Sequence, residues 1–222
     1  MTPLLQIYQS LFDYYGPQGW WPIHQEGYHH LNYRIPRNSK ERLEICFGAI
    51  LTQNTNWKNV EKAILNMFKL NLFDTDTFDK ISLKNLESAI KPSGYFVQKA
   101  KKLKAFFDYY KTLNECNLPT REGLLAIWGI GPETADSILL YAYQTPQFVV
   151  DSYTKRLLTN LNMISEKSNY QQIKQLFETQ IPSNVPLYQE FHALLVAHGK
   201  NFYSKKPYGG CFLEIHQQDF PQ

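Results

Sequence analysis

One segment of the chain combines a turn that could bind a phosphate group with a carboxylate that could act in catalysis. Residues 118–151 read LPTREGLLAIWGIGPETADSILLYAYQTPQFVVD, so the glycine turn at 129–131 separates two helical stretches. Its two glycines permit positive φ and close approach of another backbone. Backbone amides at the start of the second stretch can bind a phosphate without reading a base. Asp151 ends the segment, directly after two valines.

Each part of this segment also has an ordinary structural interpretation. A GxG turn often only connects two helices, and Asp151 could simply be the N-cap of a helix that begins near Ser152. The pattern predicts a helix–hairpin–helix followed by a carboxylate. This segment alone does not distinguish a catalytic role of the carboxylate from a capping role, so evidence from other segments is needed.

The elements around this segment follow a helical period. Apolar residues recur at spacings of three and four, as in amphipathic helices, and no sustained strand alternation occurs. We therefore predict an all-α protein. Its turns suggest a helical barrel domain at 37–148 that contains the hairpin, and a second helical domain formed by both ends of the chain, 1–36 and 149–222. The clearest helical runs are Val60-Ala63-Ile64-Met67, Val97-Ala100-Leu103-Phe107 and Ala135-Ile138-Leu139-Ala142.

Composition excludes several classes of protein. The 222 residues are 43% hydrophobic and 19% charged, which is typical of a folded chain, and a net charge of +3 is too small to identify a polyanionic partner. No apolar run is long enough for a membrane span, and we expect neither an export signal nor a membrane partner. Cys46, Cys116 and Cys211 form no CxxC pair, so this chain alone cannot supply a four-cysteine iron–sulfur cluster or an all-cysteine zinc site.

Five segments, in order, resemble the helix–hairpin–helix DNA glycosylases of the endonuclease III superfamily, and together they cover most of the chain. The resemblance implies a two-lobed all-α fold with the active site in the cleft between the lobes, and double-stranded DNA containing a damaged base as the partner. The segments are GAILTQNTNWKNVEKA (48–63), KPSGYFVQKAKKL (91–103), IWGIGPETA (127–135), VVDSYTKRL (149–157) and FHALLVAHGK (191–200).

Two departures from the family pattern narrow the resemblance. Bifunctional members carry a catalytic lysine where this chain has Glu133, and a carboxylate cannot form an imine. The tail HGKNFYSKKPYGGC resembles the family's cluster loop but keeps only Cys211 of the four ligands. Together with the WWP at 20–22, these losses make the chain most similar to the cluster-free 3-methyladenine DNA glycosylase III branch. We expect no iron–sulfur cluster and no protein-bound metal. Two questions stay open: whether the hairpin binds a monovalent cation, and whether Lys200 or Lys206 replaces the cluster structurally.

The resemblance assigns the catalytic role to Asp151. Breaking an N-glycosidic bond builds positive charge on the deoxyribose, which a fixed carboxylate stabilises while it orients a water molecule. The cationic alkylated base must leave the duplex and should stack on aromatic faces. Trp20 and Trp21 are the best candidates, although they could instead form a buried aromatic cluster. The predicted base pocket consists of Trp20, Trp21, Glu133 and Phe47.

DNA contacts are expected at two loop tips, at the hairpin and at lysines. Gln53 and Tyr95 match the family's positions that fill the gap left by the extruded base. Gln53 could also bond the orphaned partner base and Tyr95 could wedge between base pairs; otherwise they are a helix-terminal residue and a surface aromatic. The predicted DNA-binding residues are Gln53, Tyr95, Gly129, Ile130, Gly131, Thr134, Lys99 and Lys206.

These inferences predict a monofunctional DNA N-glycosylase of base excision repair that flips and excises an alkylated purine such as 3-methyladenine. Two alternatives stay open. One is an endonuclease III-like glycosylase and AP lyase for oxidised pyrimidines, and the other is a non-catalytic helix–hairpin–helix DNA-binding protein. We expect a monomer in the bacterial cytoplasm, associated with the nucleoid.

Overall fold

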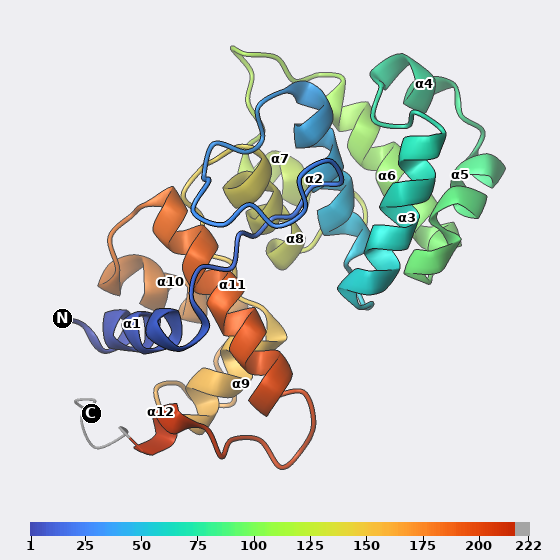
Figure 1. The fold of residues 1–222 in the computed structure, drawn as a ribbon. Coiled ribbons are helices and arrows are strands. Elements are labelled where there is room, and N and C mark those ends of the chain that lie inside the picture. The colour runs from blue at the N-terminus through green and yellow to red at the C-terminus, as the bar shows by residue number, and fades with distance from the viewer. Residues whose placement is uncertain (216–222) are drawn as a thin grey trace. The chain divides into compact units, whose positions relative to one another are not determined.

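The computed structural model describes residues 1–215, which form helices joined by loops (Figure 1). These residues contain no strand, only two isolated bridges, and the prediction of an all-α chain is confirmed. No helix among them is long and apolar enough to cross a membrane. The helices are α1 Pro3–Tyr15, α2 Ser39–Leu51, α3 Trp57–Lys69, α4 Thr75–Lys80, α5 Leu83–Ile90, the 3-10 turn η1 Lys91–Ser93, α6 Phe96–Tyr110, α7 Arg121–Leu125, α8 Pro132–Ser137, the π-helical turn η2 Ile138–Ala142, α9 Ser152–Asn160, α10 Tyr170–Gln180, α11 Val185–Phe202 and α12 Phe212–Ile215.

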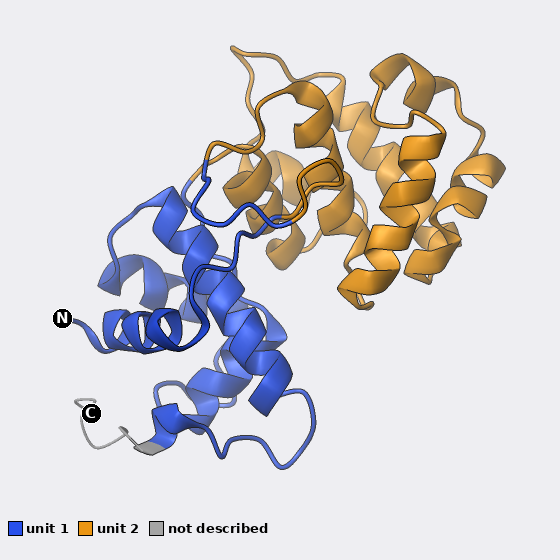
Figure 2. Cartoon of the chain, in the orientation of Figure 1, with its two compact units in different colours: residues 1–21, 28–33, 146–222 blue, residues 22–27, 34–145 orange. Residues whose placement is uncertain are grey.

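The chain divides into two compact units (Figure 2). Unit 1 consists of residues 1–21, 28–33 and 146–222, and unit 2 consists of residues 22–27 and 34–145. The hairpin helices α7 and α8 therefore belong to unit 2, whereas Asp151 and both ends of the chain belong to unit 1. The domain boundaries that we predict from the sequence, after residues 36 and 148, stay a prediction.

Local capping explains where most helices begin. In α10, Asn169 and Gln172 form a reciprocal capping box in which each side chain bonds the other's backbone amide. Such a cap stabilises a helix by about 1 kcal/mol. Helices α6 and α8 differ, because no side chain caps their first turn. Side-chain hydrogen bonds cap α1 to α5, α7, α9 and α11, and the capping residues are Thr2, Asn38, Asn56, Asp74, Ser82, Thr120, Asp151 and Asn184.

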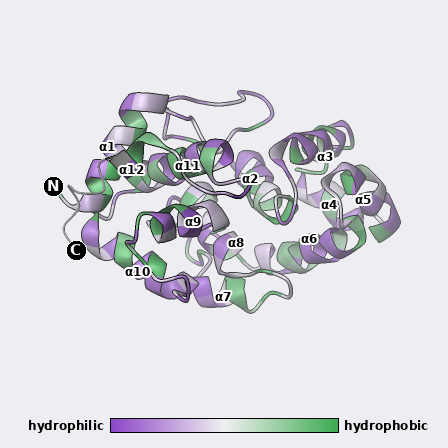
Figure 3. Cartoon of the chain, turned by 90° about the horizontal axis from the view of Figure 1, so that it is seen from below, coloured by the Kyte–Doolittle hydropathy of each residue, from purple (hydrophilic) through white to green (hydrophobic). Residues whose placement is uncertain are grey.

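Unit 2 is built around α2. This helix is buried on nearly all sides, and α3, α6 and α8 with η2 pack against it. Phe47 lies at the centre of an aromatic cluster, with its ring centroid 4.6 Å from that of Phe78 and 6.2 Å from that of Phe106. The surrounding helices carry hydrophobic and hydrophilic residues on different faces, as the helical period predicts (Figure 3).

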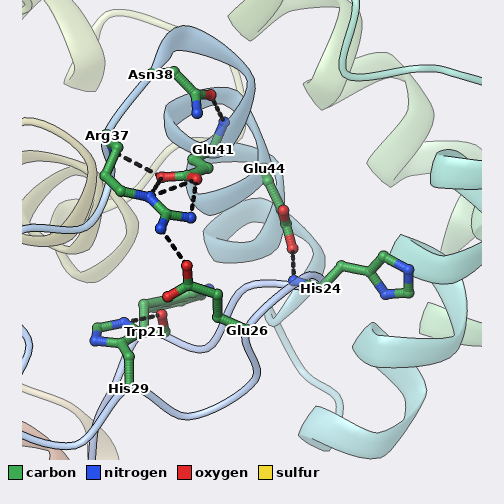
Figure 4. Close-up of polar contacts among 8 residues, drawn as sticks. All are labelled: Trp21, His24, Glu26, His29, Arg37, Asn38, Glu41 and Glu44. Atoms are coloured by element: carbon green, nitrogen blue, oxygen red, sulfur yellow. Dashed lines mark hydrogen bonds and ion pairs between the residues drawn. The ribbon is translucent and has the colours of Figure 1, made fainter.

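The loop that enters unit 2 is fixed to α2 by carboxylates (Figure 4). Arg37 pairs with Glu26 and, through its Nη2, with Glu41 at 2.6 Å. The backbone amide of His24 donates to Glu44 Oε1 at 2.6 Å, and burial raises the pKa of Glu44 to about 7. These contacts lie within unit 2 and tie residues 22–27 and 34–37 to the first half of α2.

Unit 1 has a separate aromatic core. Phe148 stacks on Phe177 of α10 with ring centroids 3.9 Å apart, and Phe191 of α11 meets both rings edge-on. Val149 and Val150 are also buried. The residues just before α9 are therefore anchored in this core, which fixes the backbone at the start of that helix.

Candidate functional site

Asp151 caps α9 and keeps one carboxylate oxygen for another partner. Its Oδ1 accepts hydrogen bonds from the backbone amide of Thr154 at 2.7 Å and from the Thr154 hydroxyl at 2.8 Å. Within the described residues both bonds go to the same oxygen, and the side chain is only partly buried. The capping interpretation and the catalytic interpretation are thus compatible, since the cap orients the carboxylate while Oδ2 remains available.

His192 of α11 is a neighbour of Asp151 that sequence reasoning missed. Its ring is buried, and burial lowers its pKa while the charge of Asp151 opposes that shift. The imidazole is therefore neutral near neutral pH. No signal in FHALLVAHGK singles it out, because His192 and His198 both lie in a mainly apolar helix.

The two tryptophans of the predicted pocket lie together in unit 1. Trp21 is buried and Trp20 is half-buried, with ring centroids 5.4 Å apart. His29 Nε2 bonds the Trp21 carbonyl oxygen at 2.7 Å (Figure 4). Tyr28 lies 5.8 Å from the Trp20 ring, and Lys200 Nζ lies 5.8 Å from the centroid of the same ring. Trp20 is thus a half-buried aromatic residue with two aromatic neighbours and a nearby cation.

The other two predicted pocket residues belong to unit 2. Phe47 has no exposed surface and packs among Phe73, Phe78 and Phe106, so the prediction that it lines a base pocket is corrected: it is a core residue. Glu133 is exposed in the first turn of α8, where an acid is favoured by the helix dipole. Its place at the pocket edge stays a prediction.

The hairpin needs only one of its two glycines for backbone geometry. Gly129 has φ of +82°, and a Cβ there would lie 2.5 Å from Lys102 Cε. Gly131 has φ of −95°, and a Cβ there would meet nothing within 4 Å, so of the two glycines only Gly129 adopts a positive φ. The amide of Ile130 donates to the Ile127 carbonyl at 3.1 Å, so it is engaged within the hairpin; phosphate binding by the hairpin stays a prediction.

Gln53 is bonded to the hairpin. Its Nε2 donates to the Gly129 carbonyl at 3.1 Å and to Thr134 Oγ1 at 3.0 Å, while its Oε1 accepts from Lys102 Nζ at 2.6 Å. The structure therefore brings three predicted DNA-binding residues together with one more lysine. In this arrangement the Gln53 amide is fully engaged, and inserting it into DNA would require these bonds to open.

Tyr95 and Lys99 differ sharply although both belong to the same predicted loop. Tyr95 is 71% exposed, has φ of +46° and directly precedes α6. Lys99 is 2% exposed, and its Nζ donates to the carbonyls of Leu51 and Ser93 at 2.7 Å each. Burial lowers the pKa of Lys99 to about 8. The prediction that Lys99 binds DNA phosphate is corrected, because its ammonium group is enclosed between backbone carbonyls.

Two further residues, Lys206 and Trp128, are exposed to solvent. Lys206 is exposed, as a phosphate-binding lysine must be, with its Nζ 5.8 Å from the Tyr208 ring centroid. Trp128 is 58% exposed between α7 and α8, directly beside Gly129. Sequence reasoning missed Trp128, although an aromatic residue next to a glycine turn was a usable signal.

Comparison with known proteins identifies close similarities in sequence. The family model described as HhH-GPD superfamily base excision DNA repair protein matches residues 47–183. The chain is 41% identical, over 91% of its length and 90% of the relative's, to the candidate DNA repair glycosylase MJ1434 of Methanocaldococcus jannaschii. It is also 30% identical to endonuclease III of Sulfolobus acidocaldarius, over 72% of this chain and 74% of that one.

Solved structures share the fold. H. pylori 3-methyladenine DNA glycosylase MagIII, bound to 1,N6-ethenoadenine, superimposes with a TM-score of 0.67 at 24% identity, over 89% of this chain and 97% of that chain. A trapped endonuclease III–DNA covalent intermediate superimposes with a TM-score of 0.75 at 17% identity, over 96% and 94% of the two chains. At these identities the likeness concerns the two-lobed all-α fold.

Proposed function

We propose a specific reaction for this chain, which belongs to the HhH-GPD superfamily of base excision DNA repair proteins and is a DNA glycosylase. In this reaction an alkylated purine such as 3-methyladenine is flipped out of double-stranded DNA and its N-glycosidic bond is hydrolysed. The DNA strand itself is left uncut.

The fixed orientation of the Asp151 carboxylate is the main observation that supports the proposal. Thr154 holds Oδ1 with two hydrogen bonds, and the preceding valines are fixed in the core of unit 1. A carboxylate held in this way needs little reorganisation when positive charge develops on a sugar beside it. Its second oxygen would stabilise that charge and orient the attacking water.

Trp20 supports an alkylated, cationic base as the substrate. Lys200 Nζ lies 5.8 Å from the ring centroid, and since like charges repel, this ammonium would have to move away before a cationic base could stack on the same face. An N3-alkylated adenine also carries positive charge, and electron-rich indole faces attract such groups by about 0.5–2 kcal/mol. In the proposed reaction the flipped base stacks on Trp20, which is only half-buried.

Unit 2 supports the proposed DNA contacts. Helix α8 begins without a side-chain cap, and the position of Gly131 leaves open space where a phosphate could approach. Tyr95 extends from the start of α6, which also lacks a cap. We assign Tyr95 as the wedge that fills the gap left by the base, and the first amides of α8 as a sequence-independent phosphate contact.

Chromatography of the bases released from damaged duplexes tests the proposed reaction. We expect release of 3-methyladenine from methylated DNA and none from undamaged DNA. Release of oxidised pyrimidines from oxidised DNA instead would favour the endonuclease III-type activity that the name of the Sulfolobus relative suggests. If no base is released from either substrate, the proposed reaction is wrong and the glycosylase acts on another class of damaged base.

We also propose that hydrogen bonds, rather than an iron–sulfur cluster, hold the C-terminal loop. Glu214 Oε1 accepts from Asn160 Nδ2 at 2.7 Å and from the Tyr203 hydroxyl at 3.2 Å, while Oε2 accepts from the Gly210 amide at 2.9 Å. Cys211 Sγ lies 3.5 Å from the Tyr203 hydroxyl. Within residues 1–215 no group of three or more His, Cys, Asp or Glu side chains could hold a metal ion.

The purified protein is accordingly expected to be colourless and free of iron, since its three cysteines are one short of a four-cysteine ligand set. Visible absorbance and elemental analysis measure this directly. Stoichiometric iron with a visible absorbance band would contradict the proposal and would indicate a cluster shared between chains.

A further inference from the structure

We infer that Lys99 is a positioning residue that fixes two loops to each other: the Gln53 loop (residues 52–56) and the Tyr95 loop (residues 91–95). The inference rests on the proposed function, in which the Tyr95 loop enters damaged DNA. The observation behind it is that one buried ammonium group donates to the Leu51 carbonyl and to the Ser93 carbonyl, both at 2.7 Å.

These two carbonyls lie at corresponding places in the two loops. Leu51 is the last residue of α2 and comes two residues before Gln53. Ser93 is the last residue of η1 and comes two residues before Tyr95. The carbonyls at the ends of helices lack partners within the helix, so a donor from outside must satisfy them when they are buried. Lys99 serves two such carbonyls at once.

The Tyr95 loop needs this support because of its backbone. Tyr95 occupies the left-handed region with φ of +46°, which is unfavourable for a residue with a large side chain and persists only where neighbouring contacts hold it. Ser93 is fully buried, and its hydroxyl donates to the Ile90 carbonyl at 2.8 Å. The ammonium of Lys99 therefore holds the segment just before Tyr95, while the phenol ring itself stays exposed.

A second lysine extends the same support to the hairpin. Lys102 follows Lys99 by three residues, which places both on one face of α6. Its Nζ donates to Gln53 Oε1 at 2.6 Å, and its alkyl chain lies against Gly129. Lys99 bonds backbone carbonyls and Lys102 bonds a side chain, so α6 links the Gln53 loop, the Tyr95 loop and the hairpin.

The consequence for the proposed reaction is that Tyr95 enters the duplex from a preorganised loop. Without Lys99, the loop would have to be ordered during binding, which weakens affinity for DNA that has lost a base. Lys99→Met keeps most of the length of the side chain and removes all donors. We expect it to weaken binding to a duplex carrying an uncleavable abasic analogue by about tenfold, because ordering the loop then costs free energy during binding.

A double-mutant cycle separates positioning from a general loss of structure. Affinity for the abasic-analogue duplex is measured for the wild type, Lys99→Met, Tyr95→Ala and the double variant, below the unfolding temperature of each. If Lys99 acts through Tyr95, most of the effect of Lys99→Met should disappear in the Tyr95→Ala background. Additive effects would overturn the inference.

Two further variants complete the experiment. Lys101→Met removes a charge from the exposed side of the same helix, and it should show no coupling to Tyr95. If Lys99→Met does not fold, Lys99→Arg is used instead. Its planar, bulkier guanidinium cannot reproduce the two 2.7 Å contacts of a compact ammonium between these carbonyls, so it should lose affinity while remaining coupled to Tyr95. No coupling there would also overturn the inference. A wild type that does not prefer the abasic-analogue duplex over undamaged DNA would instead contradict the proposed function itself.

Discussion

Asp151→Asn is expected to reduce base excision by about 100-fold or more while leaving folding and DNA binding nearly unchanged, since this is the usual effect of losing one well-placed electrostatic group. Asparagine caps helices as well as aspartate does, so its Oδ1 can still accept the bonds from Thr154. What disappears is the negative charge that would stabilise the sugar cation. Single-turnover excision from a methylated duplex, compared with binding to the same duplex, measures the effect.

The chain offers a matched control for this substitution. Asp74 caps α4 as Asp151 caps α9: its Oδ1 accepts from the Thr77 amide at 3.0 Å and from the Thr77 hydroxyl at 2.9 Å. Asp74→Asn therefore removes the same charge from the same kind of cap, and its excision rate should equal that of the wild type. Excision by Asp151→Asn within a few-fold of the wild type would return Asp151 to a purely capping role.

The sequence predicts the helical architecture well because that information is local. The spacing of Val60, Ala63, Ile64 and Met67 predicts the buried face of α3, and all four side chains are buried. Gly129 is likewise recognisable, since its positive φ is a property of the residue type. These signals lie within one turn or one helix, so no distant contact is needed to interpret them.

The environment of Lys99 could not be predicted in this way. In the sequence it belongs to a cluster of lysines that has the pattern of a solvated surface. Its burial depends on the Leu51 carbonyl, 48 residues earlier in the chain, and on the Ser93 carbonyl of a separate loop. Phe47 shows the same limit, because an apolar residue can line a pocket or fill a core, and only the neighbouring helices decide which.

Gln53 shows a third reason why the sequence does not predict the site completely. Its loop position indicates a residue that could reach DNA, yet in the structure its amide bonds Gly129, Thr134 and Lys102. A sequence pattern shows which residue occupies a loop tip, but it does not show whether that residue bonds DNA or a neighbouring segment of the protein. Gln53 therefore supports the hairpin in this state, and its insertion into DNA stays a prediction.

The wild-type protein is expected to release a base without forming a covalent adduct with DNA. An imine requires a neutral amine beside the sugar, and the resemblance to the family implies that Glu133 stands where bifunctional members carry the lysine. Lys99 and Lys102 in the nearby part of unit 2 are both engaged, the first with two carbonyls and the second with Gln53. Neither is placed as a free nucleophile.

Borohydride trapping on an abasic duplex tests this expectation, because reduction converts an imine into a stable adduct. The wild type should give no adduct and no strand cleavage without added base or heat. Glu133→Lys places an amine in the first turn of α8 and should yield a trapped adduct, whereas Glu133→Gln, which also removes the carboxylate but supplies no amine, should not. Trapping of the wild type would contradict the monofunctional assignment, and mapping of the modified lysine would then identify the nucleophile, with Lys200 beside Trp20 as the first residue to examine.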